Sequence, residues 1–366
     1  MAQPDIPETH KAIVYDDPGK ISTKIVQVKT PEPGPGEVLI RITHSGVCHS
    51  DLSLMLNQWD FLDEKVQPGQ VGGHEGIGNI VKIGAYCEQT DLSIGDRVGI
   101  KWTAYTCGTC APCLAGADGI CEKQKVSGFS CPGTFQEYVI SWAHYVTRIP
   151  GGLPSDIAAP LLCGGVTVYA ALKKSRASPG DWVVIAGGGG GLGHLAVQLA
   201  SRGMGYRVIG LDVSSKEELV KSCGAEIFLD ILSFPQDDGG DSLATEVKKH
   251  TGGKGASAVV VCSGSNAAYA QGLKFLKFNG TLVCVGVPRG RPVPVAHAYP
   301  HYMVAQQLAL VGSTVGNRKD AIEVLDMASR GVVTTHVQTA AMDNLPRFFG
   351  QMEGGTLHGR GVITMS

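Results

Sequence analysis

Residues 182–200 read WVVIAGGGGGLGHLAVQLA, and this stretch decides the fold of the 366-residue chain. The apolar run Trp182–Ala186 predicts a buried strand, and the apolar run Leu192–Ala200 predicts a helix. The stretch contains no charged residue and is nearly long enough to cross a bilayer. Because glycine is a poor helix former, the five consecutive glycines Gly187–Gly191 favour a strand, a tight turn and a helix over one membrane-spanning helix.

The turn carries the spacing G-x-G-x-x-G, with Gly188, Gly190 and Gly193 at the three glycine positions. Gly191 and Leu192 complete the spacing. Glycine permits a tight turn and a close approach of the backbone to a pyrophosphate, and the start of the helix offers unpaired N–H groups. A glycine run also suits a flexible turn, so the residues that follow decide between a dinucleotide site and a plain linker.

Asp212 follows the apolar run Tyr206–Leu211, about 20 residues beyond the glycines. A carboxylate at this strand end accepts hydrogen bonds from the ribose hydroxyls of a dinucleotide and repels a 2′-phosphate. The pattern therefore predicts NAD(H) as the cofactor in preference to NADP(H). Lys216 presents a positive charge nearby and softens this discrimination. The alternative is an ordinary solvated aspartate at the end of a strand.

Strand-like runs alternate with helix-length segments after Ala158, which predicts an α/β domain with a doubly wound parallel sheet. Its expected strands are Trp182–Ala186, Tyr206–Leu211, Glu226–Leu229, Ala256–Cys262 and Thr281–Val287. Before about Pro150, short alternating runs such as Glu37–Ile42 and Asp96–Ile100 predict mainly antiparallel β structure.

The C-terminal part of the chain is expected to return to the first domain. A further strand near Leu308–Val315 is followed by helix-like segments at Lys319–Arg330 and Asn344–Glu353 and by a last strand at Gly361–Thr364. The predicted boundaries are therefore 1–164 with 314–366 for one domain and 165–313 for the other.

Composition favours small neutral partners and a cytosolic location. Charged residues are 17% of the chain and the formal net charge is -2, which argues against a nucleic-acid partner. Residues 1–10 lack the basic start and apolar run of a secretory signal, so the expected location is the cytoplasm, with no membrane partner. The eleven cysteines form no secreted disulfide pattern.

Four cysteines lie close together in a lobe that spans about residues 103–125. They are Cys107, Cys110, Cys113 and Cys121, with the spacing C-x2-C-x2-C-x7-C. Four thiolates close a tetrahedral zinc shell with no open position, which is typical of a structural zinc site. Two disulfides or an iron–sulfur cluster are the alternatives.

Three other segments carry possible metal ligands: residues 46–51 read GVCHSD, residues 72–76 read GGHEG, and residues 161–165 read LLCGG. Spacing alone does not join them. A buried cysteine is usually a small apolar residue and a lone histidine a satisfied polar group, so the residues by themselves favour packing roles.

Taken together, these motifs resemble the zinc-dependent medium-chain alcohol dehydrogenases of the fungal and yeast type. G-V-C-H-S-D, G-G-H-E-G-x-G, the four-cysteine lobe, L-C-G-G-V-T-V-Y and the glycine turn occur in the order of that family over nearly the whole chain. Further similar stretches are Gly99–Trp102, Gly205–Val208, Val311–Ser313 and Val315–Arg318. The resemblance implies a GroES-like catalytic domain, a Rossmann domain, two zinc ions per chain and hydride transfer between NAD(H) and primary or small secondary alcohols, aldehydes or ketones.

The resemblance also implies an assembly. Family members of this type form homotetramers, and a homodimer is the alternative. The sheet edge near Leu308–Val315 is the expected place for subunits to pair.

The resemblance assigns Cys48, His74 and Cys163 to the catalytic zinc, with a fourth position for water or the substrate oxygen. Glu75 is implied as an alternative zinc ligand, and Asp51 as the carboxylate that orients the histidine.

Further family positions fall on the proton path, the cofactor and the substrate. Ser50 is the hydroxyl that takes the alcohol proton, and His49 and Arg360 are implied contacts of the pyrophosphate. The remaining cofactor-pocket positions are Thr167, Phe228, Val285, Val287, Ser313 and Val315. The implied wall of the substrate pocket comprises Trp59, Trp102 and Val287, for which core packing is a comparable explanation.

Ser53 departs from the family pattern, because yeast-type members carry a histidine there that completes the proton relay to solvent. Either Ser53 and water carry the proton, or the enzyme is a specialised reductase of a larger carbonyl, iminium or conjugated substrate. A non-enzymatic zinc- and dinucleotide-binding protein is disfavoured by the intact ligand set and the open metal position.

Overall fold

The computed structural model of the chain describes residues 5–365. Its contacts divide the chain into two compact units. Unit 1 contains Met1–Cys163, Asn317–Ser329 and Thr335–Ser366, and unit 2 contains Gly164–Gly316 and Arg330–Thr334. Relative to the predicted domains, the first segment ends at residue 163 instead of 164 and the chain returns at 317 instead of 314. The short segment Arg330–Thr334 belongs to unit 2, which the sequence does not predict.

Unit 2 is built on a six-stranded sheet whose order is β12-β11-β10-β13-β14-β15. All five pairings are parallel, so the predicted doubly wound sheet is confirmed. The strands are β10 Trp182–Ala186, β11 Arg207–Asp212, β12 Ile227–Asp230, β13 Ala256–Val261, β14 Leu276–Cys284 and β15 Ala309–Gly312.

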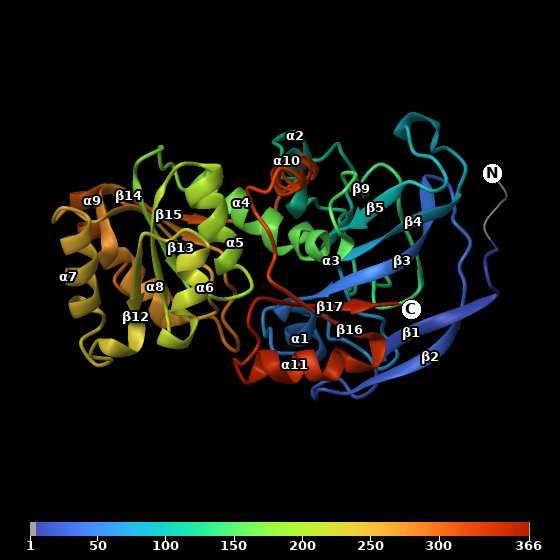
Figure 1. The fold of residues 1–366 in the computed structure, drawn as a ribbon, viewed down its shortest axis with the longest axis horizontal. Coiled ribbons are helices and arrows are strands. Elements are labelled where there is room, and N and C mark those ends of the chain that lie inside the picture. The colour runs from blue at the N-terminus through green and yellow to red at the C-terminus, as the bar shows by residue number, and fades with distance from the viewer. Residues whose placement is uncertain (1–4, 366) are drawn as a thin grey trace. The chain divides into compact units, whose positions relative to one another are not determined.

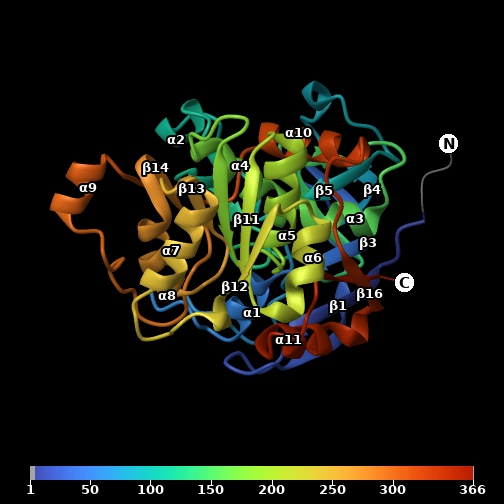
Figure 2. The same ribbon diagram turned by 60° about the vertical axis from the view of Figure 1, so that its left-hand side comes forward.

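Helices lie on both faces of this sheet, as Figures 1 and 2 show for α5 and α6 on one face and α7 and α8 on the other. The helices of unit 2 are α4 Gly164–Lys174, α5 Gly193–Gln198, α6 Glu217–Ser222, α7 Asp241–His250, α8 Asn266–Gly272 and α9 Pro300–Gln306. Strand β13 is buried along its whole length, as expected for a strand covered on both faces.

Two predicted elements of unit 2 differ from the structure. The helix expected at Leu192–Ala200 is α-helical only over Gly193–Gln198 and continues as a π-helix over Leu199–Gly203. Strand β14 begins at Leu276, five residues before the predicted start at Thr281, and ends at Cys284. Asn279 adopts a left-handed backbone conformation with φ 60°, and the register with β13 shifts in the same region. The alternation of apolar residues is broken there, which hid the beginning of the strand.

Unit 1 contains a seven-stranded sheet of order β16-β17-β3-β4-β5-β9, with β8 also paired to β3. The pairings are antiparallel except for β16 with β17. The strands are β3 Glu37–Val47, β4 Gly76–Ile83, β5 Arg97–Ile100, β8 Tyr138–Trp142, β9 Thr147–Arg148, β16 Val337–Ala341 and β17 Arg360–Thr364. The last strand of the chain therefore pairs with β3, beside the segment that begins at Cys48.

Two small antiparallel ribbons complete the β structure of unit 1. They pair β1 Thr9–Tyr15 with β2 Thr23–Lys29, and β6 Thr103–Tyr105 with β7 Lys125–Val126. The helices of unit 1 are α1 His49–Met55, α2 Ala111–Leu114, α3 Ser155–Ala158, α10 Arg318–Ser329 and α11 Leu345–Glu353. Helix α1 is absent from the sequence-based prediction.

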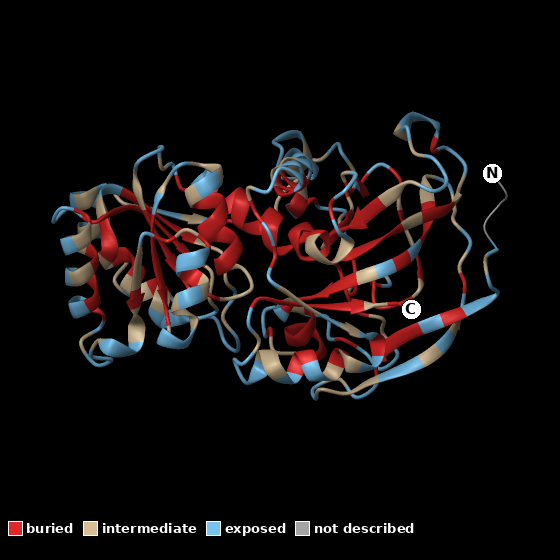
Figure 3. Ribbon diagram, in the orientation of Figure 1, coloured by how far each residue is buried: buried red, intermediate tan, exposed pale blue. Residues whose placement is uncertain are grey.

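Within each unit the buried residues follow the sheets, whereas the outer faces of helices such as α7 and α11 are exposed (Figure 3). Among the described residues, no single helix is long and apolar enough to cross a membrane. One bent pair of helical segments, Ser155–Leu162 and Gly164–Lys174, satisfies that test by length and composition together.

Candidate functional site

Three segments of unit 1 bring the candidate ligands of the catalytic metal together. Cys48 ends the segment after β3 and caps α1, and His74 and Glu75 directly precede β4. Antiparallel pairing of Ser45 with Gly76 places these two segments side by side. Cys163 ends the 3-10 helix Ala159–Leu162 and supplies the third segment.

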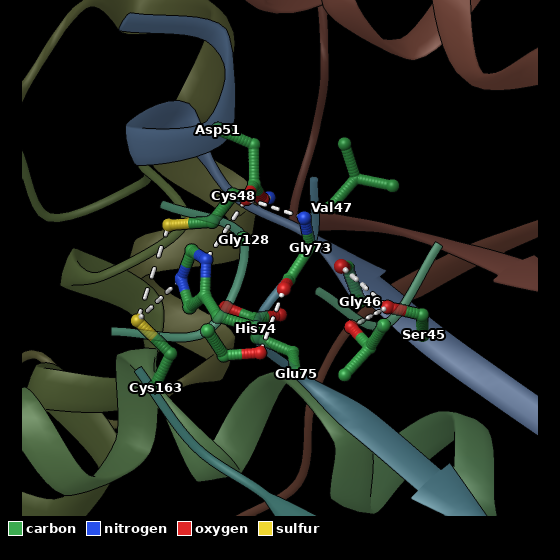
Figure 4. A network of polar contacts seen from close by, with 12 residues as sticks. Ser45, Gly46, Val47, Cys48, Asp51, Gly73, His74, Glu75, Gly128 and Cys163 are labelled. Carbon is green, nitrogen blue, oxygen red and sulfur yellow. Dashed lines mark hydrogen bonds and ion pairs between the residues drawn. The ribbon is translucent and has the colours of Figure 1, made fainter. Parts of the chain in front are cut away.

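The ligand atoms converge on one point, as Figure 4 shows for the two sulfurs and the imidazole. The Sγ atoms of Cys48 and Cys163 are 4.0 Å apart, and Nε2 of His74 lies 3.3 Å from Sγ of Cys163. A tetrahedral zinc with Zn–S bonds of about 2.3 Å separates two sulfurs by about 3.8 Å. The two thiols and the imidazole therefore fit a single four-coordinate zinc with one position left over.

Asp51 fixes the orientation of the histidine ligand. Its Oδ1 lies 2.9 Å from Nδ1 of His74 and also accepts from the backbone N–H of Gly73 at 3.2 Å. The other oxygen accepts the backbone N–H of Cys48 at 3.0 Å. Because the acceptor on the Nδ1 side makes Nδ1 the protonated nitrogen, Nε2 is left free to bind a metal. One buried carboxylate thus fixes the backbone at Cys48 and at the residue next to His74.

Glu75 is fully buried beside these ligands and pairs with Arg360 on the last strand. The guanidinium of Arg360 also donates to the carbonyl oxygen of Val47 at 3.3 Å. Burial raises the pKa of Glu75, and the neighbouring positive charge of Arg360 opposes this effect and favours the carboxylate. A side chain at Gly46 would overlap the Glu75 carboxylate, so glycine is required there. The carboxylate lies within reach of the same metal, since one oxygen belongs to the group of ligand atoms lying within 4.8 Å of one another.

Helix α1 carries the residues of the implied proton path. Ser50 is half-buried in its first turn, and Ser53 is 1% exposed one turn later. The hydroxyl of Ser53 lies 3.3 Å from Nδ1 of His49, whose side chain belongs to an exposed residue. Ser53 is thus joined to an imidazole, although the family's histidine is missing at position 53 itself.

Aromatic side chains lie against the metal ligands on one side. Trp102 meets the ring of His74 edge-on, with centroids 4.9 Å apart and planes at 90°. Trp59 lies 6.4 Å from Trp102, and Phe61 stacks on Trp59 at 5.8 Å. The sequence does not predict a role for Phe61, because a single aromatic residue in a polar loop carries no periodic signal.

The four-cysteine lobe forms a second candidate metal site. Sγ of Cys121 lies 3.5 Å from Sγ of Cys107 and 3.7 Å from Sγ of Cys110. These separations match the edges of a zinc–thiolate tetrahedron and are far longer than an S–S bond of about 2.05 Å. Backbone N–H groups of Cys107 and Lys123 donate to the Cys121 sulfur at 3.3 Å, which stabilises a thiolate. Cys113 completes the group of four ligand atoms.

In unit 2, the glycine turn and the aspartate meet at the carboxyl end of the sheet. Ala186 is in register with Leu211, so the end of β10 lies beside the end of β11. The Asp212 carboxylate accepts the backbone N–H of Gly189 at 2.8 Å. A side chain at Gly193 would overlap the carbonyl of Gly187, so the helix approaches the turn only because residue 193 is glycine. The stem of Lys216 lies next to Gly189.

The other predicted cofactor positions are spread over the ends of the elements of unit 2. Thr167 is buried in α4, Phe228 is half-buried in β12, and Val285 follows β14. Val287, predicted for both the cofactor and the substrate pocket, is 47% exposed. Ser313 is buried, and its hydroxyl has no hydrogen-bond partner among the described residues.

Val315 and Arg360 occupy unusual surroundings for their predicted roles. Val315 has a φ of 32°, which is rare for a β-branched residue and occurs mainly where surrounding structure enforces it. Arg360 was predicted as a pyrophosphate contact, and in unit 1 its buried guanidinium pairs with Glu75. The contact with the cofactor stays a prediction.

Two families of protein domains match the sequence. Residues 34–151 match the alcohol dehydrogenase GroES-like domain, and residues 191–330 match the zinc-binding dehydrogenase domain. The first range includes Cys48, His74 and the four-cysteine lobe, and the second includes Asp212.

Curated fungal proteins are similar over nearly the whole chain. Alcohol dehydrogenase 2 of Emericella nidulans is 56% identical over 367 residues, which cover 100% of both chains. An alcohol dehydrogenase of Schizosaccharomyces pombe is 40% identical over 356 residues, which cover 97% of both.

Solved structures agree with this similarity. The alcohol dehydrogenase of Aeropyrum pernix superposes with a TM-score of 0.84 at 31% identity, covering 97% of this chain and 99% of that one. The acetophenone reductase of Geotrichum candidum, solved with NAD, has a TM-score of 0.82 at 28% identity and covers 99% of this chain and 98% of its own.

Proposed function

Since the chain belongs to the zinc-binding alcohol dehydrogenase family, we propose that it interconverts primary or small secondary alcohols with the matching aldehydes or ketones. The observation that carries the proposal is the convergence of Cys48, His74 and Cys163 on one point with a fourth position open. In this proposal, a hydride passes between the substrate and NAD(H). The glycine turn and Asp212 of unit 2 support NAD(H) as the cofactor.

The catalytic centre would hold zinc on Cys48, His74 and Cys163. When bound, zinc supplies a Lewis acid that makes an alcohol far easier to deprotonate than it is in water. Two thiolates balance the metal charge, so an anionic product is not held too tightly to leave. Asp51 keeps His74 in the metal-binding tautomer and orientation.

Residues of this chain would carry the alcohol proton away. Ser50 lies in the first turn of α1, close in sequence to the ligand Cys48, and its hydroxyl would accept the proton from the alcohol. Ser53 and its neighbour His49 then form the pair through which a proton reaches solvent, at the position where the family histidine is missing. Arg360 and Glu75 balance each other beside the metal, and Glu75 would be free to enter the metal shell during ligand exchange.

Two zinc ions per chain are part of this proposal. The sulfur separations in the four-cysteine lobe support a closed structural site there. The wall formed by Trp59 and Trp102 would face the substrate.

We also propose that the chain forms a homotetramer, with a homodimer as the alternative, and works in the cytoplasm. Strand β15 is one edge of its sheet, and Leu310 on it is 41% exposed, which supports subunit pairing along that edge. A reducing compartment suits the thiolates of both metal sites.

The proposed activity is tested with a panel of short, branched and bulky aldehydes and iminium compounds, using NADH and NADPH. Turnover of short aldehydes with NADH is the expected result. Turnover only of iminium or conjugated compounds would favour the specialised reductase that Ser53 leaves open, and tight NADH binding without any turnover would contradict both. Cys163→Ala should abolish turnover without unfolding the chain, and retained turnover would refute the zinc assignment.

A further inference from the structure

Lys101 is a buried lysine that the proposed reaction does not use. It directly follows β5 and is only 3% exposed. Its amine donates to the carbonyl oxygen of Tyr145 at 2.7 Å and to Oγ1 of Thr147 at 2.8 Å, and lies 4.4 Å from the centre of the Tyr145 ring. Burial lowers the pKa of this amine to about 7, which shows that the charged amine loses favourable hydration in the folded protein. The hydrogen bonds to Tyr145 and Thr147 offset part of this loss. An amine donates both hydrogen bonds whether or not it is charged.

Tyr145 continues the contact into the four-cysteine lobe. Its hydroxyl donates to Oδ2 of Asp118 at 2.9 Å, and the ring is 3% exposed. Asp118 begins the 3-10 helix Asp118–Ile120, which leads into the ligand Cys121. Burial raises the pKa of the Tyr145 phenol, and the neighbouring Asp118 carboxylate raises it further, so the phenol stays protonated as the donor.

The lobe has few other means of holding its position. Helix α2 follows Cys110 and includes Cys113. It contains no buried residue, and Leu114 at its end is 76% exposed. Apart from the Tyr145–Asp118 bond, Nδ2 of Asn317 donates to the carbonyl of Gly116 at 2.9 Å, and Nε2 of His144 lies 3.0 Å from the carbonyl oxygen of Thr106, next to Cys107. Without a core of its own, the lobe depends on such polar contacts for its orientation.

Next to Lys101 in the sequence, Trp102 contacts the catalytic metal centre. Lys101 is bonded directly to Trp102, whose ring lies edge-on to His74 at 4.9 Å. The backbone carbonyl of Trp102 accepts the N–H of Ser127, whose hydroxyl donates to the carbonyl of Gly73 beside His74. The two adjacent residues therefore contact the anchor of the lobe on one side and a metal ligand on the other.

We propose that Lys101 and Tyr145 are positioning residues that couple the metal-binding lobe to the Trp102 wall of the catalytic site. A metal in the lobe fixes Asp118, Asp118 fixes Tyr145, and Tyr145 with Lys101 fixes the backbone that carries Trp102. The inference rests on the proposed function, since it requires a metal in the lobe and a substrate beside Trp102.

The first measurement follows the lobe metal alone. In zinc-loaded full-length protein carrying Cys163→Ala, which disables the catalytic site, zinc transfer to a chromogenic chelator reports the lobe. Adding Tyr145→Phe removes one hydrogen bond to a carboxylate and keeps the ring, so release should be roughly tenfold faster. Lys101→Met should have a similar effect, and the two together should be less than additive because they break one connection. Lys82→Met is the control, since Lys82 pairs with Glu32 on the surface.

The second measurement uses the same substitutions with Cys163 intact. Tyr145→Phe and Lys101→Met should raise KM for the alcohol several-fold while kcat stays within about twofold, because the wall is displaced and the metal ligands are kept. The coupling would be overturned if zinc left the lobe of Tyr145→Phe at the wild-type rate. It would also be overturned if zinc left faster but KM for the alcohol did not change. A wild-type chain without turnover would refute the proposed function, and the release assay would still decide whether Tyr145 and Lys101 hold the lobe.

Discussion

Oδ1 of Asp51 lies 2.9 Å from Nδ1 of His74, with side chains that are 1% and 0% exposed. The same carboxylate accepts the backbone N–H groups of Cys48 and Gly73. A single side chain therefore sets the tautomer of one metal ligand and the backbone at another. This arrangement gives the first of four predictions.

Asp51→Asn should weaken zinc binding at the catalytic centre by about 10- to 100-fold, because an amide provides no charge and favours the wrong tautomer of His74. Titration of the metal-free protein with zinc, followed by competition with a chelator, measures the effect. Asp17→Asn is the matched control, since Asp17 is an exposed carboxylate that pairs with Lys20 on the surface. Unchanged zinc affinity in Asp51→Asn would show that the carboxylate is not needed to orient the ligand.

Ser53→His should raise the rate of alcohol oxidation at neutral pH, because it restores an imidazole at the missing relay position. The pH profile of kcat is the measurement, and the gain should be greatest near neutrality, where an imidazole still accepts protons. Ser53→Ala removes the hydroxyl that contacts His49 and should lower the rate. Identical profiles for the three proteins would indicate that the proton leaves by another route.

Asp212→Asn should reduce the preference for NAD over NADP. Loss of a charged acceptor weakens NAD binding roughly tenfold, and removal of the negative charge lessens repulsion of a 2′-phosphate. The ratio of kcat/KM for the two cofactors measures the change. Glu226→Gln is a suitable control, because Glu226 lies just before the opposite end of β12 and pairs with Arg207 on the surface. The same cofactor ratio in Asp212→Asn and the wild type would remove Asp212 from the cofactor site.

The free energy of unfolding should rise with pH above about 7 more steeply in the wild type than in Lys101→Met. Burial lowers the pKa of Lys101 to about 7, with Arg318 lowering it further and Asp118 opposing. Above that pH the folded chain has lost a proton that the unfolded chain keeps until about pH 10.4, so stability increases across this window. Below pH 7 both states are charged and the slope disappears.

Denaturant unfolding of zinc-saturated protein at several pH values between 6 and 10 tests this expectation. The difference between the two proteins should change by up to about 1.4 kcal/mol per pH unit above neutrality. Parallel curves would mean that Lys101 keeps its ordinary pKa in the folded protein.

Sequence patterns predicted the sheet of unit 2 well because buried parallel strands are continuous apolar runs. Strand β10 agrees at both ends with the predicted run Trp182–Ala186. The beginning of β14 was missed because its first residues, including the exposed Phe278 and the left-handed Asn279, do not form such a run. The π-helical continuation of α5 likewise has no counterpart in the spacing of apolar residues.

The metal centre shows a different limit. Its ligands lie on three segments that are far apart in the chain but close together in the structure. The spacing of residues within each segment does not predict this, and only the resemblance to a known family indicated that the three segments form one site. Helix α1 was missed because it is seven residues long and is stabilised by Asp51, which caps it from within a functional motif. The contact between Lys101 and Tyr145 could not be predicted either, because the two residues are distant in sequence. The same holds for the bond between Tyr145 and Asp118.

Strand β17 makes the catalytic centre depend on contacts between distant parts of the chain. Its first residue, Arg360, is the buried partner of Glu75, which lies 285 positions earlier in the sequence. The next residue, Gly361, pairs with Val47, directly before the ligand Cys48. Contacts between distant residues require loop closure, whose entropic cost is met before the contact stabilises the fold. The metal centre therefore reaches its final charge balance only when this late strand has paired with β3.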